Sequence, residues 1–224
     1  MRHDYGNSIC LSTQVGCAVN CAFRASAKNG FIRNLSVGEM VAQLLAFRKY
    51  VDPELHSIVL MGTGEPLLNY DNVIAFIQLI HGEDTFFLGY RNMSLSTSGI
   101  VPRMYDLAAA GMPITLAVSL HAPNDTIRRQ IMPIAEPYCC PDILKAAQHY
   151  FDVTGRRVTF EYILIKNINC SRACAEELSR LMAGKNILIN VIPINDTLTP
   201  GLVRPGKKEI QTFVDTLQAH KIPV

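Results

Sequence analysis

The chain has 224 residues, of which 49% are hydrophobic and 18% are charged, and its formal net charge at pH 7 is +2. No apolar run reaches the length of a membrane span, and the first residues lack the apolar stretch of a secretory signal, so we expect a cytoplasmic protein with no membrane partner. The small net charge neither requires nor excludes nucleic acid as a partner.

Short runs of β-branched residues alternate with amphipathic segments along the whole chain. In chain order, the predicted strands are 8–14, 57–61, 92–97, 115–120, 158–165 and 187–194. The predicted helices are 37–50, 72–81, 101–110, 141–151, 172–182 and 207–220. Ser36 precedes the first helix as N-cap, and Glu39 completes a capping box with it.

These six strand–helix units imply parallel strands joined by right-handed crossovers. A complete eight-unit barrel needs about 250 residues. We therefore predict an α/β fold with a partial (β/α)6 TIM-like barrel, and a doubly wound sheet is the alternative. In both folds, ligands bind at the C-terminal ends of the strands.

The seven cysteines are an odd number, which favours metal binding or thiol chemistry over a disulfide framework. Two of them follow the first predicted strand, at the spacing Cys17-x3-Cys21-x2-Arg24. Three thiolates at the spacing C-x3-C-x2-C can hold three irons of a 4Fe-4S cluster. The guanidinium of Arg24 has no free lone pair for iron. Two cysteines alone are equally compatible with structural packing.

Polar residues also follow the other predicted strands. The glycines of 62–65 would let the backbone approach a ligand, and Glu65 could accept a hydrogen bond from an ammonium group. Taken singly, such residues are often turns or helix caps. Their convergence at one edge of a sheet is typical of a polar cofactor site. The strand-end residues are Gly64, Glu65, Ser96, Ser119, His121 and Asn195.

The ordered set of motifs is far more specific than any one of them. The runs are YGNSICLSTQVGCAVNCAF, RNLSVGEM, MGTGEPLLNYDNV, LSTSGIVP, SLHAPND, YILI and NVIPIN. Together they resemble the bacterial radical-SAM adenine methyltransferases. These are the dual-specificity 23S rRNA and tRNA adenine-C2 methyltransferase and the related C8 enzyme that confers ribosome-antibiotic resistance.

This resemblance implies a radical-SAM barrel with a 4Fe-4S cluster and S-adenosyl-L-methionine as cofactors. It implies that the substrate is 23S rRNA, and with it tRNA. The implied site of methylation is carbon C2 of an adenine, and carbon C8 is the alternative. It also implies an electron donor such as flavodoxin and a monomeric enzyme. One core domain over residues 1–224 is expected, without the family's N-terminal RNA-binding domain and C-terminal methyl-carrier segment.

The resemblance also implies roles for single residues. Cys17 and Cys21 are implied as cluster ligands, and Cys10 as the catalytic cysteine that helps to resolve a covalent enzyme–RNA intermediate. From its position alone, Cys10 would be a small buried strand residue. The implied S-adenosylmethionine site consists of Gly64, Glu65, Ser96, Ser119, Leu120, His121 and Asn195.

Arg24 stands where the family has the third cluster cysteine, so we expect impaired activity. The alternative is a non-catalytic remnant that binds S-adenosylmethionine or RNA. Five basic residues could then contact phosphate, although scattered charges are more often a solvated surface: Lys28, Arg33, Arg91, Arg128 and Arg129. Cys170 and Cys174 could share one helical face as metal ligands, but packing is the preferred interpretation.

Overall fold

The computed structural model describes residues 2–3, 6–24, 30–52, 54–132, 137–195 and 201–224. Its centre is a seven-stranded sheet in the order β1-β2-β5-β6-β7-β8-β9. β1 pairs antiparallel with β2, and every other neighbouring pair is parallel. The strands are β1 (Arg2–His3), β2 (Gly6–Cys10), β5 (Ser57–Leu60), β6 (Met93–Thr97), β7 (Thr115–Ser119), β8 (Val158–Leu164) and β9 (Ile187–Pro193).

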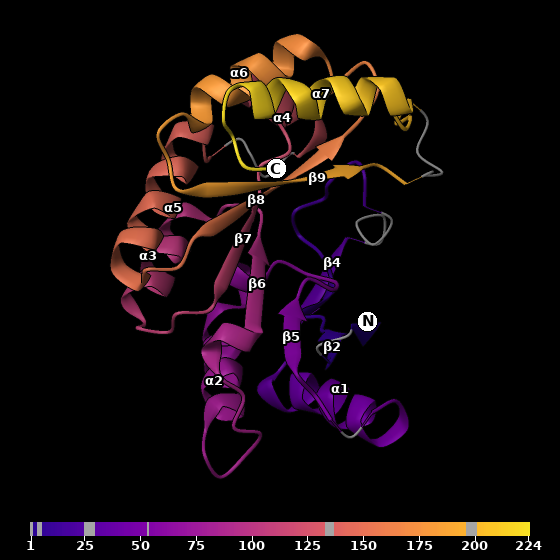
Figure 1. Ribbon diagram of the computed structural model, residues 1–224. Helices are drawn as coiled ribbons and strands as arrows, with labels where there is room; N and C mark the ends of the chain where they lie inside the picture. The colour runs from indigo at the N-terminus through magenta and orange to yellow at the C-terminus, as the bar shows by residue number, and fades with distance from the viewer. Residues whose placement is uncertain (1, 4–5, 25–29, 53, 133–136, 196–200) are drawn as a thin grey trace.

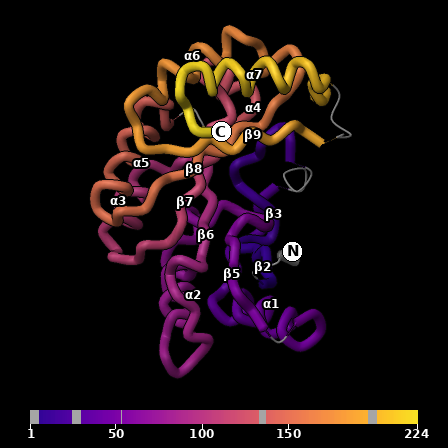
Figure 2. The backbone as a smooth tube through the Cα atoms, in the orientation of Figure 1, coloured from indigo at the N-terminus to yellow at the C-terminus, as the bar shows by residue number. Residues whose placement is uncertain are grey.

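The six parallel strands curl into an open half-barrel. Figure 1 shows β9 crossing the direction of β5 and β6 steeply, with the helices outside the curl, and the tube in Figure 2 follows the same path. The fold is therefore the predicted partial barrel and not the doubly wound alternative. The helices are α1 (Val37–Tyr50), α2 (Tyr70–His81), α3 (Val101–Ala109), α4 (Asp125–Ile131), α5 (Cys140–Thr154), α6 (Arg172–Met182) and α7 (Lys207–Ala219).

The predicted capping box at the start of α1 is confirmed. The Ser36 hydroxyl accepts a hydrogen bond from the backbone N–H of Glu39 at 3.3 Å, and the Glu39 carboxylate accepts one from the backbone N–H of Ser36 at 2.9 Å. Both bonds satisfy N–H groups that have no partner within the helix. This local reason explains why α1 begins where the sequence predicts.

The predicted strand 8–14 is wrong in one respect, because the chain turns out of the sheet partway along it. β2 ends at Cys10, and a separate strand β3 (Gln14–Gly16) pairs antiparallel with β4 (Phe31–Asn34). The backbone N–H of Thr13 binds the carbonyl of Thr63 at 2.9 Å, which turns the chain toward the loop after β5. The sequence also gave no sign of α4, which spans only seven residues.

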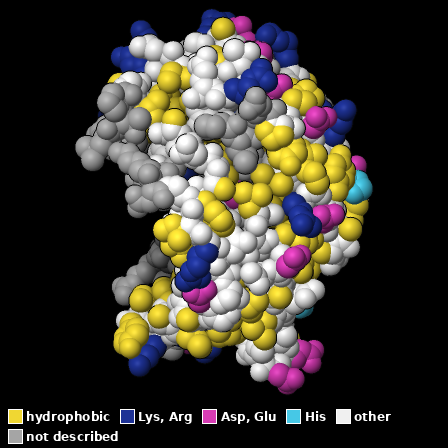
Figure 3. All heavy atoms as spheres, turned by 180° about the vertical axis from the view of Figure 1, so that it is seen from behind, with side chains coloured by type: hydrophobic (Ala, Val, Ile, Leu, Met, Phe, Trp, Pro, Cys, Tyr) yellow, Lys and Arg dark blue, Asp and Glu magenta, His cyan; other side chains and the backbone are white. Residues whose placement is uncertain are grey.

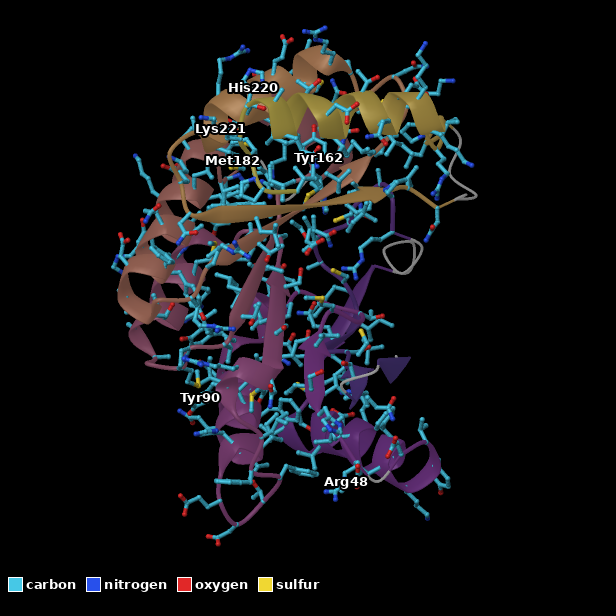
Figure 4. The ribbon with its side chains drawn as sticks, in the orientation of Figure 1. Arg48, Tyr90, Tyr162, Met182, His220 and Lys221 are labelled. Carbon is cyan, nitrogen blue, oxygen red and sulfur yellow. The ribbon has the colours of Figure 1, made fainter. Side chains whose placement is uncertain are left out.

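The core has two parts. The larger lies between the sheet and its helices, where Tyr162 of β8 packs against Phe213 of α7 with ring centroids 5.1 Å apart (Figure 4 shows Tyr162 beneath α7). The smaller lies under the cysteine loop and joins Cys17, Val19 and Cys21 to Ile131, Met132, Ile163, Ile165 and Ile194. Within the described residues, no helix is long and apolar enough to cross a membrane.

Candidate functional site

A cavity of about 230 Å³ opens where the cysteine loop meets the C-terminal ends of the strands. Its lining joins residues that are far apart in the sequence but follow adjacent strands, as the parallel order of the sheet requires. Most of the predicted site residues line it: Cys17, Cys21, Gly64, Glu65, Ser96, Ser119 and His121.

Three predicted site residues are not among those that line this cavity. Cys10 is exposed at the end of β2, so the expectation of a buried strand residue is wrong. The side chain of Leu120 is fully buried in the main core. Asn195 is exposed just after β9. The roles assigned to these three residues stay predictions.

The loop after β5 forms a tight turn against the start of β3. Gly64 has φ +112°, and a Cβ atom there would lie 2.7 Å from the Cβ atom of Gln14. The side-chain oxygen of Gln14 accepts a hydrogen bond from the backbone N–H of Glu65 at 2.9 Å. Only glycine has both the backbone freedom and the lack of a side chain that this turn needs.

Glu65 connects the ends of β5 and β6. Its buried carboxylate accepts hydrogen bonds from the backbone N–H of Leu67 at 3.1 Å and of Ser98 at 2.6 Å. Burial raises the pKa of this carboxyl, and the backbone hydrogen bonds oppose that rise. The side chains of Thr97 and Ser98 beside the carboxylate also lower its pKa.

His121 is a neutral hydrogen-bond donor at the cavity. Its Nδ1 accepts a hydrogen bond from the backbone N–H of Ile163 at 3.0 Å, which requires the ring proton on Nε2. Burial, together with the nearby charges of Arg128 and Arg24, lowers the pKa of His121 to about 3. The ring of Phe23 meets the imidazole edge-on, with centroids 4.8 Å apart.

Arg128 was one of the five basic residues named as candidates for phosphate contact, and its fully buried side chain contradicts both this role and a place on a solvated surface. The guanidinium donates to the carbonyls of Leu120 at 3.1 Å, Ser119 at 3.2 Å and Tyr138 at 3.3 Å, and also to that of Ser98. It therefore holds together the chain ends after β6 and β7. This role was missed from the sequence, because α4 itself was not predicted.

The other basic candidates do not form one surface. Arg33 pairs with Glu39 at 2.7 Å, Arg91 and Arg129 are exposed, and Lys28 lies outside the described residues. Figure 3 shows the Lys and Arg side chains of one face scattered and not gathered in a single patch. These charges are typical of a solvated surface.

The cysteine loop brings two thiols together but offers no third. Cys17 and Cys21 are buried, with 3% and 7% of their surface exposed, and burial raises the pKa of Cys21 to about 12. Arg24 Nη2 donates to the carbonyls of Met61 at 3.2 Å and Gly62 at 3.0 Å. In the described part of the chain, no group of three or more His, Cys, Asp or Glu residues could hold a metal. The residues present therefore do not fit a 4Fe-4S cluster held by three thiolates.

A larger cavity, of about 400 Å³, lies near the N-terminal ends of α6 and α7 and contains none of the predicted site residues. Cys170 borders it, but Cys170 and Cys174 both pack into the main core. The Ser171 hydroxyl donates to the sulfur of Cys174 at 3.2 Å. These contacts support the packing interpretation of the two cysteines.

A family model described as the radical SAM superfamily matches residues 11–172. The chain is 48% identical over 222 residues to the "Probable dual-specificity RNA methyltransferase RlmN" of Clostridium novyi (strain NT), covering 99% of this chain and 65% of that protein. A relative of the same name from Symbiobacterium thermophilum is 44% identical, with 99% and 61% covered. The chain thus spans less than two thirds of the length of these relatives.

Solved structures agree with the fold. A radical SAM methyltransferase from Sphaerobacter thermophilus superimposes with a TM-score of 0.93 at 42% identity, covering 96% of this chain and 64% of that one. Streptococcus suis SuiB bound to S-adenosylmethionine gives a TM-score of 0.68 at 16% identity, with 96% and 48% covered, and shows the shared fold alone.

Proposed function

Because this chain belongs to the radical SAM superfamily, whose members use a 4Fe-4S cluster and S-adenosylmethionine, we propose that it is the core of an RNA methyltransferase. The substrate we propose is an adenine carbon of 23S rRNA and of tRNA, at C2, with C8 as the alternative. We assign residues 1–224 to a single core domain. The observation that carries the proposal is the cavity at the strand ends, together with 48% identity to a relative named as such an enzyme.

The cavity residues suit an adenosyl amino acid. The carboxylate of Glu65 can interact with the ammonium group of the ligand, and the Nε2–H of His121 can donate to a ring nitrogen or a hydroxyl. The hydroxyls of Ser96 and Ser119 supply further polar contacts along the same edge. Leu120 and Asn195 complete the proposed site, and Cys10 is the proposed catalytic cysteine.

Cys17 and Cys21 are the proposed cluster ligands, and Arg24 replaces the third. We propose that this replacement impairs the activity, since two thiolates leave a cluster labile. The test is anaerobic reconstitution with iron and sulfide of the unaltered chain and of Arg24→Cys, followed by absorbance and EPR. A reducible cluster signal gained only by Arg24→Cys is expected. A stable, reducible signal in the unaltered chain would overturn the proposed impairment.

The RNA part of the proposal needs a separate test. A titration with a 23S rRNA fragment and with tRNA at several salt concentrations should show salt-dependent binding. Absence of binding to both at low salt would count against an RNA substrate. The proposed cellular setting is the cytoplasm, with a monomeric enzyme and an electron donor such as flavodoxin.

A second candidate function is a non-catalytic binding domain. The observation that favours it is Arg24, which occupies the position of the third ligand and is hydrogen-bonded to the loop after β5. Calorimetry with S-adenosylmethionine and the RNA titration address both functions. Binding without cluster formation would favour this second candidate.

A further inference from the structure

Arg24 joins the cysteine loop to the loop after β5. Its Nη2 donates to two consecutive carbonyls, those of Met61 at 3.2 Å and Gly62 at 3.0 Å. Met61 and Arg24 both line the cavity, and Gly62 belongs to the turn that carries Glu65. The side chain therefore connects the cysteine loop to the loop after β5 at the edge of the cavity.

The other two nitrogens of the Arg24 guanidinium, Nε and Nη1, are available as donors to a ligand. Both protons of Nη2 go to the carbonyls, which leaves three N–H donors, one on Nε and two on Nη1. Among the described residues, no ion pair to Arg24 and no hydrogen bond from its Nε or Nη1 is present. The half-buried cation at this cavity thus lacks a carboxylate partner within the described chain.

The carboxylate of Glu65 lines the same cavity but does not pair with Arg24. Its oxygens accept the backbone N–H groups of Leu67 at 3.1 Å and of Ser98 at 2.6 Å, and no ion pair between Glu65 and Arg24 is present among the described residues. A ligand carboxylate near Arg24 would therefore meet a cation that is fixed in place and only partly hydrated.

We propose that Arg24 turns the cluster site into a carboxylate-binding site, so that this chain binds an S-adenosyl amino acid without any metal. The α-carboxylate of the ligand accepts from Nη1 of Arg24, while the carbonyls of Met61 and Gly62 hold the guanidinium in position. This inference rests on the proposed function in one respect, namely that the cavity takes the adenosyl group.

The test is calorimetry on the full chain after treatment with a chelator, with two probes. S-adenosylhomocysteine carries the carboxylate, and 5′-methylthioadenosine has the adenosyl group without the amino acid. A charge-assisted hydrogen bond corresponds to an affinity gain of about 10- to 100-fold. We expect the metal-free chain to bind S-adenosylhomocysteine tighter than 5′-methylthioadenosine by that factor.

Two variants test whether the preference for S-adenosylhomocysteine depends on Arg24. Arg24→Gln should lower the preference for S-adenosylhomocysteine about 10-fold or more, whereas the exposed Arg91→Gln, as matched control, should keep the preference. Equal binding of the two probes by the unaltered chain would overturn the inference, and so would an undiminished preference in Arg24→Gln. The probe comparison in the unaltered chain decides the question even if Arg24→Gln fails to fold.

The two proposals fail differently. If reconstituted Arg24→Cys binds S-adenosylmethionine but the metal-free chain shows no preference between the probes, the inference fails and the proposed function stands. If neither chain binds any of the three adenosyl compounds, the cavity is not an adenosyl site and both proposals fall.

Discussion

His121 and Ile163 join the ends of two neighbouring strands, with the imidazole Nδ1 accepting the backbone N–H of Ile163 at 3.0 Å. His121 has φ +60°, a left-handed conformation that is uncommon for residues other than glycine. The hydrogen bond fixes the ring in the form that carries its proton on Nε2. His121 thus presents a fixed hydrogen-bond donor to the cavity. This arrangement requires the neutral imidazole, because a protonated Nδ1 could not accept the bond from Ile163.

The pKa of His121 predicts how stability depends on pH. Its value falls from 6.5 to about 3 on folding, so the unfolded chain binds more protons between these pH values. The contribution of a neutral His121 to stability is complete above pH 6.5 and is lost as the pH falls toward 3, at up to about 1.4 kcal/mol per pH unit.

His121→Asn should reduce this slope, because asparagine does not titrate and tolerates positive φ. The measurement is urea unfolding of the metal-free chain between pH 4.5 and 7. The difference in pH slope between the unaltered chain and the variant gives the contribution of the imidazole, since the buried carboxyl of Glu65 is present in both. An identical slope in both chains would show that His121 does not titrate as expected.

Arg128→Met should destabilise the protein by about 3–5 kcal/mol. The substitution leaves the carbonyls of Ser98, Ser119, Leu120 and Tyr138 without their donor in a buried place. The free energy of unfolding in urea measures the effect. Arg129→Met is the matched control, because the exposed neighbour should change stability by less than about 0.5 kcal/mol. Comparable losses in both variants would contradict the role of Arg128.

Asn169 joins three segments around His121. Its amide nitrogen donates to the carbonyls of His121 at 2.7 Å and Ile163 at 2.6 Å, and its oxygen accepts the backbone N–H of Ile165 at 2.7 Å. Asn169→Leu should cost about 2–4 kcal/mol in thermal or urea unfolding, because these buried groups lose their partners. The exposed Asn190→Leu, which removes a single side-chain hydrogen bond to Glu161, serves as control, and an equal loss there would count against this network.

Gly64→Ala should weaken both stability and binding of an adenosyl ligand. Gly64 has φ +112°, and the added Cβ would lie 2.7 Å from the Cβ atom of Gln14. We expect a loss of about 1–3 kcal/mol from backbone strain. Gly38→Ala is the control, because its Cβ would meet no atom within 4 Å and it lies in α1, where alanine is favoured over glycine by about 1 kcal/mol. Equal stability of the two alanine variants would contradict this account.

The sequence by itself determined the succession of the six parallel strands and of the helices except α4, the start of α1 and several of the residues at the cavity. These features depend on patterns that repeat every two to four residues and on the rule that parallel strands end at one edge. The strand that ends at Cys10 was harder to delimit, because the bond from Thr13 to Thr63 that turns the chain joins distant segments.

Only the tertiary structure decided which of two adjacent arginines is buried, what Asn169 binds and where Arg24 is held. Arg128 and Arg129 are the same residue type, and only the inward face of α4 distinguishes them. The bonds from Arg24 span 37 and 38 positions, and the bond from Asn169 to His121 spans 48. No local pattern carries such information, because these partners are far apart in the sequence and meet only in the folded chain.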